Sequence, residues 1–364
     1  MILERYLTWR LLQSFLMVSG VFVGMLLLLD MVEQMRRAAD MPVSFGQILR
    51  LSLLNAPEGF YEIAPLVLLL SAMWVGLSLS RSSEMVVIRA SGRSVPRLLV
   101  VPALSVLVLS MGFVALMNPL VASTSREYSR ALAQLRGEPV SAVVLGADGL
   151  WLRQADVQGQ TVIHARRAEA NGTLLHEVTF LVFHPSAGVS QRFFAERAEL
   201  RPGQWALSQV KRWDLSDLNP EASALREVSL ALPTDLTPEQ ISDSFARVRA
   251  IPLFQLPGFI ATLERAGFSA LEHRMRLQME LALPVLLVGM MLLALATSIH
   301  HMRAGGAGIR ALVTILAGFA LFFLRNFAQV LGETGQIPVA LAAWGLPVAT
   351  FLLAVGVMLN LEEG

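Results

Sequence analysis

Six apolar runs, each about as long as a bilayer is thick, constrain this chain more than any other feature. An α-helix needs roughly 20 mostly apolar residues to cross the hydrocarbon core, so each run can span a membrane. The 364 residues are 54% hydrophobic and 16% charged, which excludes a disordered chain. We therefore predict an α-helical integral membrane protein with six transmembrane helices, at about 11–29, 60–79, 95–116, 279–299, 309–330 and 339–359.

The stretch from 138 to 245 has a different pattern. Its apolar runs are short and alternate with polar residues, and turn signals such as Asn171-Gly172 and Arg201-Pro202-Gly203 separate them. This pattern predicts an all-β, jelly-roll-like domain inserted between helices 3 and 4. Three parts follow: transmembrane helices 1–3 in residues 1–137, the β domain in 138–245, and a return helix with transmembrane helices 4–6 in 246–364.

Proline and Asn-Pro pairs suggest where the helices end. An amphipathic segment at 48–54 is expected to end near Pro57, before the second span. Asn118-Pro119 is expected to close the third span, and a separate helix should follow at 123–136.

Arginines give the expected orientation. Arg5 and Arg10 precede the first span, and Arg81, Arg89 and Arg93 lie between the second and third spans. Because positive residues are enriched in cytoplasmic loops, this arrangement places both termini in the cytoplasm and the β domain outside, in the periplasm. The first span is then a retained signal-anchor.

The loop after the second span can form a short helix near 82–92. Ser82 or Ser83 can cap its start, and Gly92 can end it. We interpret this helix as a coupling element that a cytosolic partner grips. The alternative is an ordinary turn, since Val86-Val87-Ile88 favours a strand as much as a helix.

The single lysine excludes one kind of chemistry. A nucleotide-binding P-loop ends in Gly-Lys-Ser/Thr, but Lys211 stands in Gln-Val-Lys-Arg. The chain is therefore expected to be no enzyme, and any ATP hydrolysis would belong to another subunit. A net charge of +1 gives no footprint for nucleic acid, and the scattered histidines have no metal-ligand spacing.

Five arginines are candidates for binding an anionic lipid. Arg36 and Arg37 follow the first span, Arg126 and Arg130 follow the third, and Arg325 lies inside the fifth. Guanidinium groups bind phosphate oxygens in a fork, whereas the alternative is simple snorkelling to the interface. Arg325 is costly in a membrane unless it faces the bundle interior or reaches an interface, where it could meet a headgroup or Glu33.

Several motifs, in this order, carry a resemblance to a known family. They are Glu33-Gln34-Met35-Arg36-Arg37-Ala38, the stretch from Arg81 to Gly92, Arg126-Glu127-Tyr128, Leu150-Trp151 and Gly308-Ile309-Arg310. With three spans, a β domain and three more spans, the whole chain resembles the LptF/LptG family of lipopolysaccharide-export permeases, most closely the LptG type.

The resemblance implies a permease subunit of an ATP-driven exporter in the bacterial inner membrane. Its partners would be a homologous LptF-like permease chain, a cytosolic ATPase dimer that binds ATP and magnesium, and a single-span periplasmic bridge protein. Lipopolysaccharide would enter from the outer leaflet of the inner membrane, and this chain would hold no cofactor.

The resemblance also implies residue roles. Arg36 and Arg37 would contact lipid phosphates, Arg126 would lie at the rim of the cavity, and Arg130 stands near the position of a second family arginine. The fifth span carries Arg325-Asn326 where an acidic residue is expected. Contacts with the ATPase would come from the coupling helix, through Glu84, Met85, Ile88, Arg89 and Gly92.

Two other functions remain open from the residues alone. One is a scaffold subunit that drives a periplasmic partner without passing substrate. The other is an ion-coupled secondary transporter, which would need acidic groups inside the membrane. The acidic residues instead cluster at the ends of the spans, which argues against ion coupling: Asp30, Glu33, Glu58, Glu62 and Glu280.

Overall fold

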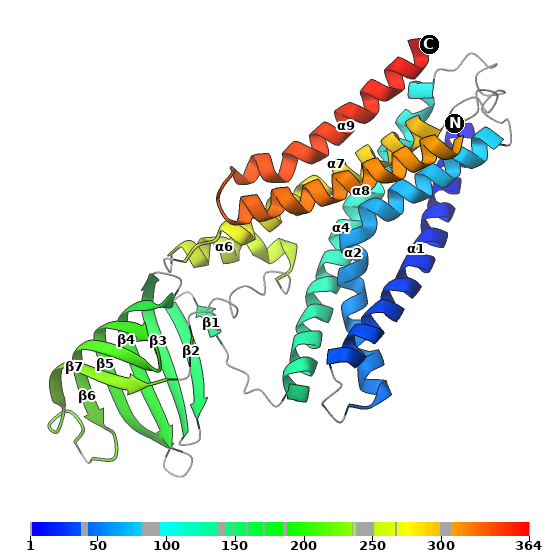
Figure 1. Cartoon of the computed structure of the whole chain (residues 1–364). Helices are drawn as coiled ribbons and strands as arrows, with labels where there is room; N and C mark the ends of the chain where they lie inside the picture. The colour runs from blue at the N-terminus through cyan, green and yellow to red at the C-terminus, as the bar shows by residue number, and fades with distance from the viewer. Residues whose placement is uncertain are drawn as a thin grey trace. The chain divides into compact units, whose positions relative to one another are not determined.

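The computed structural model divides the chain into two compact units, 1–132 with 274–364, and 133–273. The first unit is helical and the second contains the β-sheet (Figure 1). The structure describes residues 2–37, 43–81, 95–136, 143–146, 149–156, 159–169, 172–184, 188–217, 219–234, 236–237, 251–265, 268–298 and 307–363.

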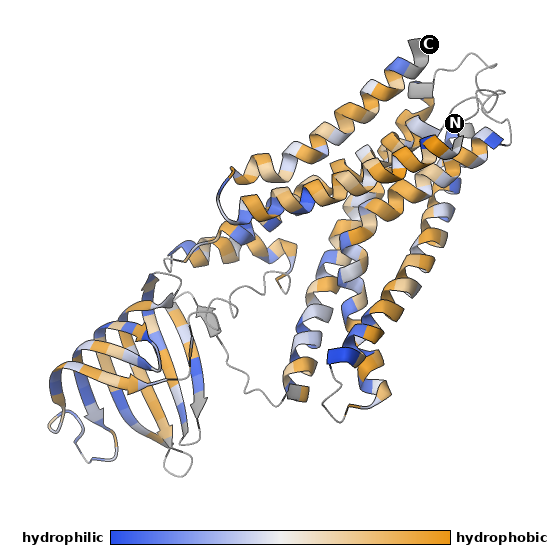
Figure 2. Ribbon diagram, in the orientation of Figure 1, coloured by the Kyte–Doolittle hydropathy of each residue, from blue (hydrophilic) through white to orange (hydrophobic). Residues whose placement is uncertain are grey.

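Six helices of the described residues are long and apolar enough to cross a membrane, as predicted. Hydrophobic residues predominate along them (Figure 2), and helices satisfy their backbone hydrogen bonds internally, which a bilayer requires. The chain is therefore a multi-pass membrane protein. The helices are α1 (Ile2–Arg37), α2 (Phe45–Arg81), α4 (Val95–Arg136), α7 (Leu271–Ser298), α8 (Ala307–Glu333) and α9 (Val339–Glu363).

The predicted helix ends at prolines were wrong. α2 continues through Pro57 and Pro65, and α4 continues through Pro102 and Pro119 into the segment that was expected to be separate. Proline removes one hydrogen bond and bends a helix, but in a membrane an interrupted helix would expose still more unpaired backbone. α2 accordingly changes direction along its length rather than ending (Figure 1).

Polar contacts at three levels hold α1 against α2. Arg10 donates to Ser78 Oγ at 2.6 Å, and Ser14 Oγ donates to the carbonyl of Ser71 at 3.1 Å. Towards the other end, the amide of Asn55 donates to Asp30 Oδ1 at 2.8 Å. Because lipid tails give no hydrophobic drive for helix pairing, such hydrogen bonds and close packing fix the register of the pair.

The second unit confirms the predicted all-β insertion. Its strands are antiparallel and pair in chain order from β1 to β7, so the sheet is an up-and-down meander without Greek-key crossings. A two-residue turn, Pro202-Gly203, joins β5 to β6, and the φ of +76° at Gly203 suits glycine. The strands are Val143–Gly146, Gly149–Asp156, Gly159–Glu169, Leu174–His184, Gly188–Arg201, Gln204–Asp214 and Leu225–Pro233.

The sheet bends along a line that crosses its strands. Buried side chains alternate along β5 as Phe193 and Ala195, then resume three residues later at Ala198. The same three-residue step between buried side chains occurs in β3, β4 and β6. Glu177 in β4 and Gln209 in β6 lie within these steps and have φ of 51° and 54°. The bend keeps the apolar face of both halves buried, around Trp205 and Phe180.

Two charged residues stand at this bend on the exposed face. Arg166 donates to Glu177 at 2.8 Å, and this hydrogen bond holds the pKa of the glutamate below its ordinary value. Both side chains are more than half exposed, so the pair adds little stability.

A buried hydrogen bond joins β2 to the residues after β7. Thr234 Oγ1 donates to Gln154 Oε1 at 2.7 Å, and Thr234 Oγ1 in turn accepts from the backbone amide of Leu236 at 3.2 Å. Gln154 and Thr234 are 8% and 4% exposed. The contact therefore closes the bent sheet across its two distant strands.

We expect Thr234→Val to lower the free energy of unfolding of the β domain by about 1–3 kcal/mol, because the buried side-chain oxygen of Gln154 then loses its hydrogen-bond donor. Thermal unfolding of the full chain, followed by tryptophan fluorescence, measures the change. The exposed Ser208→Val in β6 is the control. Equal unfolding midpoints for the two variants would show that the contact does not close the sheet.

The return segment begins the path back to the membrane. Its described part is a short 3-10 turn, Leu253–Gln255, followed by α6 (Leu256–Arg265). α6 buries Leu256, Ile260 and Leu263, which share one face at helical spacing.

Candidate functional site

The end of α1 carries two exposed arginines held by one carboxylate. Glu33 accepts two hydrogen bonds from Arg36, at 2.8 and 2.9 Å, and one from Arg37 at 2.8 Å. The spacing of three and four residues places the three side chains on adjacent positions of the helix surface. The arginine side chains are 76% and 52% exposed, so both guanidinium groups remain accessible to a ligand.

The end of α4 has the same composition. Arg126, Glu127 and Arg130 are exposed, and Arg130 donates to Glu127 at 2.6 Å. Here too a glutamate at helical spacing orients an arginine.

A partly buried contact brings these two helix ends together. The amide of Gln34 on α1 donates to the hydroxyl of Tyr128 on α4 at 2.8 Å, and Tyr128 lies within electrostatic range of Arg37. We call the resulting group of arginines and glutamates the basic rim: Arg36, Arg37, Arg126, Arg130, Glu33 and Glu127. Its six charges leave a net of two positive charges, which suits an anionic ligand.

Sequence reasoning missed a buried polar cluster among the helices. Glu280 of α7 is 8% exposed and accepts hydrogen bonds from Tyr61 of α2 and, at 3.0 Å, from Asn118 of α4. Arg276, one helical turn before Glu280, lies 3.7 Å from the same carboxylate. The only sequence signal is this spacing of four residues, since Glu280 alone looks like a charge at the end of a span.

Arg325 lies near this cluster and not among the rim residues that sequence reasoning grouped it with. It acts electrostatically on Tyr61, together with Arg276. Glu33, the acidic partner suggested from the sequence, is instead occupied by Arg36 and Arg37. The fifth span thus places its arginine within electrostatic range of Tyr61, a member of this cluster.

The end of α2 is fixed to the end of α7. Ser80 Oγ donates to the carbonyl of Ser298 at 3.0 Å. One turn earlier, a Cβ on Gly76 would lie only 2.6 Å from Ser298 Cβ, so the helices touch here because this residue is glycine. The predicted coupling residues Glu84, Met85, Ile88, Arg89 and Gly92 follow this contact and lie outside the described residues.

Comparison with known proteins identifies the family. Residues 5–360 match the model of a family described as lipopolysaccharide export system permease LptF/LptG. The chain belongs to the LptF/LptG family. It is similar to the lipopolysaccharide export system permease protein LptG of Escherichia coli K12, with 25% identity over 97% of this chain and 96% of the relative. The LptG protein of E. coli O6:H1 matches equally well.

The family match fits the architecture. It extends over all six spans and the β-sheet, so the fold and the relationship cover the same residues. Members of the LptF/LptG family are permease subunits, which agrees with the prediction that this chain is no enzyme.

Proposed function

We propose that this LptF/LptG-family chain is the permease subunit of an ATP-driven transporter. It extracts lipopolysaccharide from the outer leaflet of the inner membrane and passes it to a periplasmic bridge. The observation that carries the proposal is the match, over nearly the whole chain, to the family of lipopolysaccharide export permeases. The partners are a second, LptF-like permease chain, a cytosolic ATPase dimer with its ATP and magnesium, and a single-span bridge protein.

The basic rim supports an anionic lipid as substrate. Three of its arginines, Arg36, Arg37 and Arg130, are oriented by Glu33 and Glu127, yet their guanidinium groups remain exposed. Lipopolysaccharide phosphates can displace a glutamate from an arginine because both ligands present paired oxygens. In this proposal Arg36, Arg37, Arg126 and Arg130 hold phosphates at the periplasmic boundary, and Arg325 acts from the buried cluster.

The contact between α2 and α7 supports transmission of force from the cytosol. α2 leads directly into the proposed coupling helix at 82–92, and its last turns are fixed to α7 through Gly76, Ser80 and Ser298. A displacement of the coupling helix by the ATPase therefore moves two spans together. Since the single lysine is not in a P-loop, the energy of ATP enters through this contact.

The test is reconstitution of the chain with its co-purifying subunits in proteoliposomes that contain lipopolysaccharide. We expect release of lipopolysaccharide to a soluble acceptor only when ATP is added, and loss of this release with Glu84→Ala. If no ATPase co-purifies with the wild-type chain, the proposal fails.

Replacing Arg36 and Arg37 together by glutamine should raise the Kd for lipopolysaccharide roughly tenfold. Charge-assisted hydrogen bonds contribute about 1.5–3 kcal/mol each, and exposure and competition from Glu33 reduce that value. Binding of labelled lipopolysaccharide to the purified complex measures the change. Arg201→Gln, an exposed and glutamate-paired arginine of the β-sheet, is the matched control. An equal Kd for both variants would remove the rim from the substrate site.

The buried cluster favours one second candidate, an ion-coupled transporter. Glu280 is the kind of enclosed carboxylate that carries protons in membrane proteins. The same proteoliposomes discriminate, because this candidate requires transport driven by a pH gradient without ATP. The ATP-driven proposal requires transport that persists when a protonophore collapses the gradient.

A further inference from the structure

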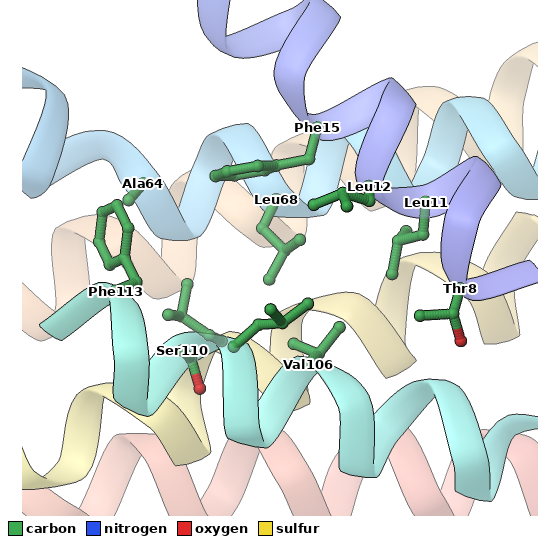
Figure 3. A pocket seen from close by; sticks show the side chains of 11 residues that line it. Thr8, Leu11, Leu12, Phe15, Ala64, Leu68, Val106, Ser110 and Phe113 are labelled. Carbon is green, nitrogen blue, oxygen red and sulfur yellow. The ribbon is translucent and has the colours of Figure 1, made fainter. Parts of the chain in front are cut away.

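An apolar groove lies between four helices of this one chain, apart from the basic rim. Its volume is about 190 Å³, and it is open on one side. α1, α2 and α4 contribute most of the lining and Leu287 of α7 contributes the rest. In Figure 3, Leu12 and Phe15 of α1 lie opposite Val106 and Phe113 of α4. Because one chain builds the groove, the groove requires no partner subunit.

The lining presents an apolar surface. Only two of its eleven residues carry hydroxyls, and both hydroxyls are bonded within their own helices: Thr8 donates to the carbonyl of Glu4 at 2.9 Å, and Ser110 to that of Leu107 at 2.8 Å. An engineered apolar cavity of about 150 Å³ excludes water and binds benzene. A groove of this size among membrane-spanning helices therefore excludes water and accepts hydrocarbon.

The groove is elongated in the direction of the helices. Its lining covers seven residue steps on α1, from Thr8 to Phe15, and seven on α4, from Val106 to Phe113. At a rise of 1.5 Å per residue, each side is about 10 Å long. This form fits a length of extended acyl chain better than a compact ring.

A positive charge lies beyond one end of the groove. Arg5 precedes Thr8 by three residues and Leu12 by seven, so it lies on the groove face of α1, and its side chain is exposed. Helical side chains point towards the N-terminus of their helix, which directs Arg5 away from the hydrocarbon and towards the boundary with water. A phosphate at Arg5 and a tail in the groove are thus compatible with one lipid molecule.

We infer that this groove binds one acyl chain of an anionic glycerophospholipid whose phosphate contacts Arg5. The site lies at the N-terminal end of α1, whereas the basic rim lies at its C-terminal end. The bound phospholipid fills space between α1, α2, α4 and α7 and so stabilises their packing. The inference rests on the groove alone and does not depend on the proposed transport function.

Native mass spectrometry of the purified full chain, with its co-purifying subunits in detergent, tests this site. The probe is phosphatidylglycerol, added to delipidated protein. We expect wild type to retain one molecule of phosphatidylglycerol. Leu109→Trp and Thr8→Phe fill the groove and should retain at least roughly tenfold less, because losing contact with two methylene groups already weakens binding about tenfold. Leu104→Trp changes another exposed leucine of α4, outside the groove, and should bind as wild type.

The headgroup is tested separately. Arg5→Gln should abolish the preference for phosphatidylglycerol over phosphatidylethanolamine, and Arg50→Gln, an exposed arginine of α2 outside the groove, should keep it. Equal retention in wild type and both filled variants overturns the site. The inference is also overturned if wild type retains lipopolysaccharide instead of phospholipid and the two filled variants do not. That result would assign the groove to the transported substrate. Loss of transport in a complex that still retains phosphatidylglycerol contradicts the proposed function and leaves this site intact.

Discussion

Glu280→Ala is expected to lower the free energy of unfolding by about 3–5 kcal/mol, the typical cost of removing one partner from a buried charged group. The substitution deletes the carboxylate shared by Tyr61, Asn118 and Arg276, which belong to three different helices. Thermal unfolding in detergent measures the loss. Glu280→Gln should cost less, because its amide oxygen can still accept one of the two hydrogen bonds.

Two further variants make this prediction specific. Glu196→Ala removes an exposed carboxylate of the β-sheet and should change stability little. The double variant Arg276→Met with Glu280→Leu should be more stable than Glu280→Ala, since removing both charges costs less than leaving one in a buried site. If Glu280→Ala and Glu196→Ala unfold at the same temperature, the cluster does not hold the helices together.

Gly76→Val is expected to uncouple ATP hydrolysis from transport, under the proposed function. Even a Cβ at this position would overlap Ser298, so valine must push α2 away from α7. Overpacking of this kind costs about 1–3 kcal/mol. Each 1.4 kcal/mol of this cost lowers the population of the α2–α7 contact roughly tenfold. We expect lipopolysaccharide release to fall by the same factor while ATP hydrolysis continues. Parallel assays of phosphate and lipopolysaccharide release from proteoliposomes measure both.

A matched glycine provides the control. Gly112 of α4 has nothing within 4 Å of its would-be Cβ, so Gly112→Val should transport as wild type. Ser298→Gly should partly rescue Gly76→Ala, because it removes the atom that the new Cβ meets. Normal transport by Gly76→Val would exclude this contact from the transmission of force.

The six spans could be predicted from the sequence because each depends only on a long local run of apolar residues. The continuity of α2 and α4 could not, since Pro57 and Pro119 are strong local signals that the membrane environment overrides. The strands were recognisable from alternation and turns such as Pro202-Gly203. Their bend was not, because the three-residue step in β5 between Ala195 and Ala198 gains meaning only when its neighbours make the same step.

The basic rim was partly predictable. Four of its arginines stand out beside the predicted spans, but their meeting depends on the contact between Gln34 and Tyr128, far apart in the chain. The position of Arg325 and the role of Glu280 depend on which faces of four helices meet. The sequence of one helix alone does not determine this. Site functions for all these residues remain predictions.

The bend in α2 has a mechanical consequence. Pro65 cannot supply the amide hydrogen that would bind the carbonyl of Tyr61, so the helix lacks a backbone hydrogen bond beside the buried cluster and bends more easily there. On one side of this hinge, Asn55 is hydrogen-bonded to α1, and on the other, Ser71 and Ser78 are hydrogen-bonded to α1 and Ser80 to α7. Bending at Pro65 therefore lets a displacement at Arg81 move this segment of α2 together with α7 and the N-terminal half of α1, while Asn55 keeps the other segment bonded to Asp30.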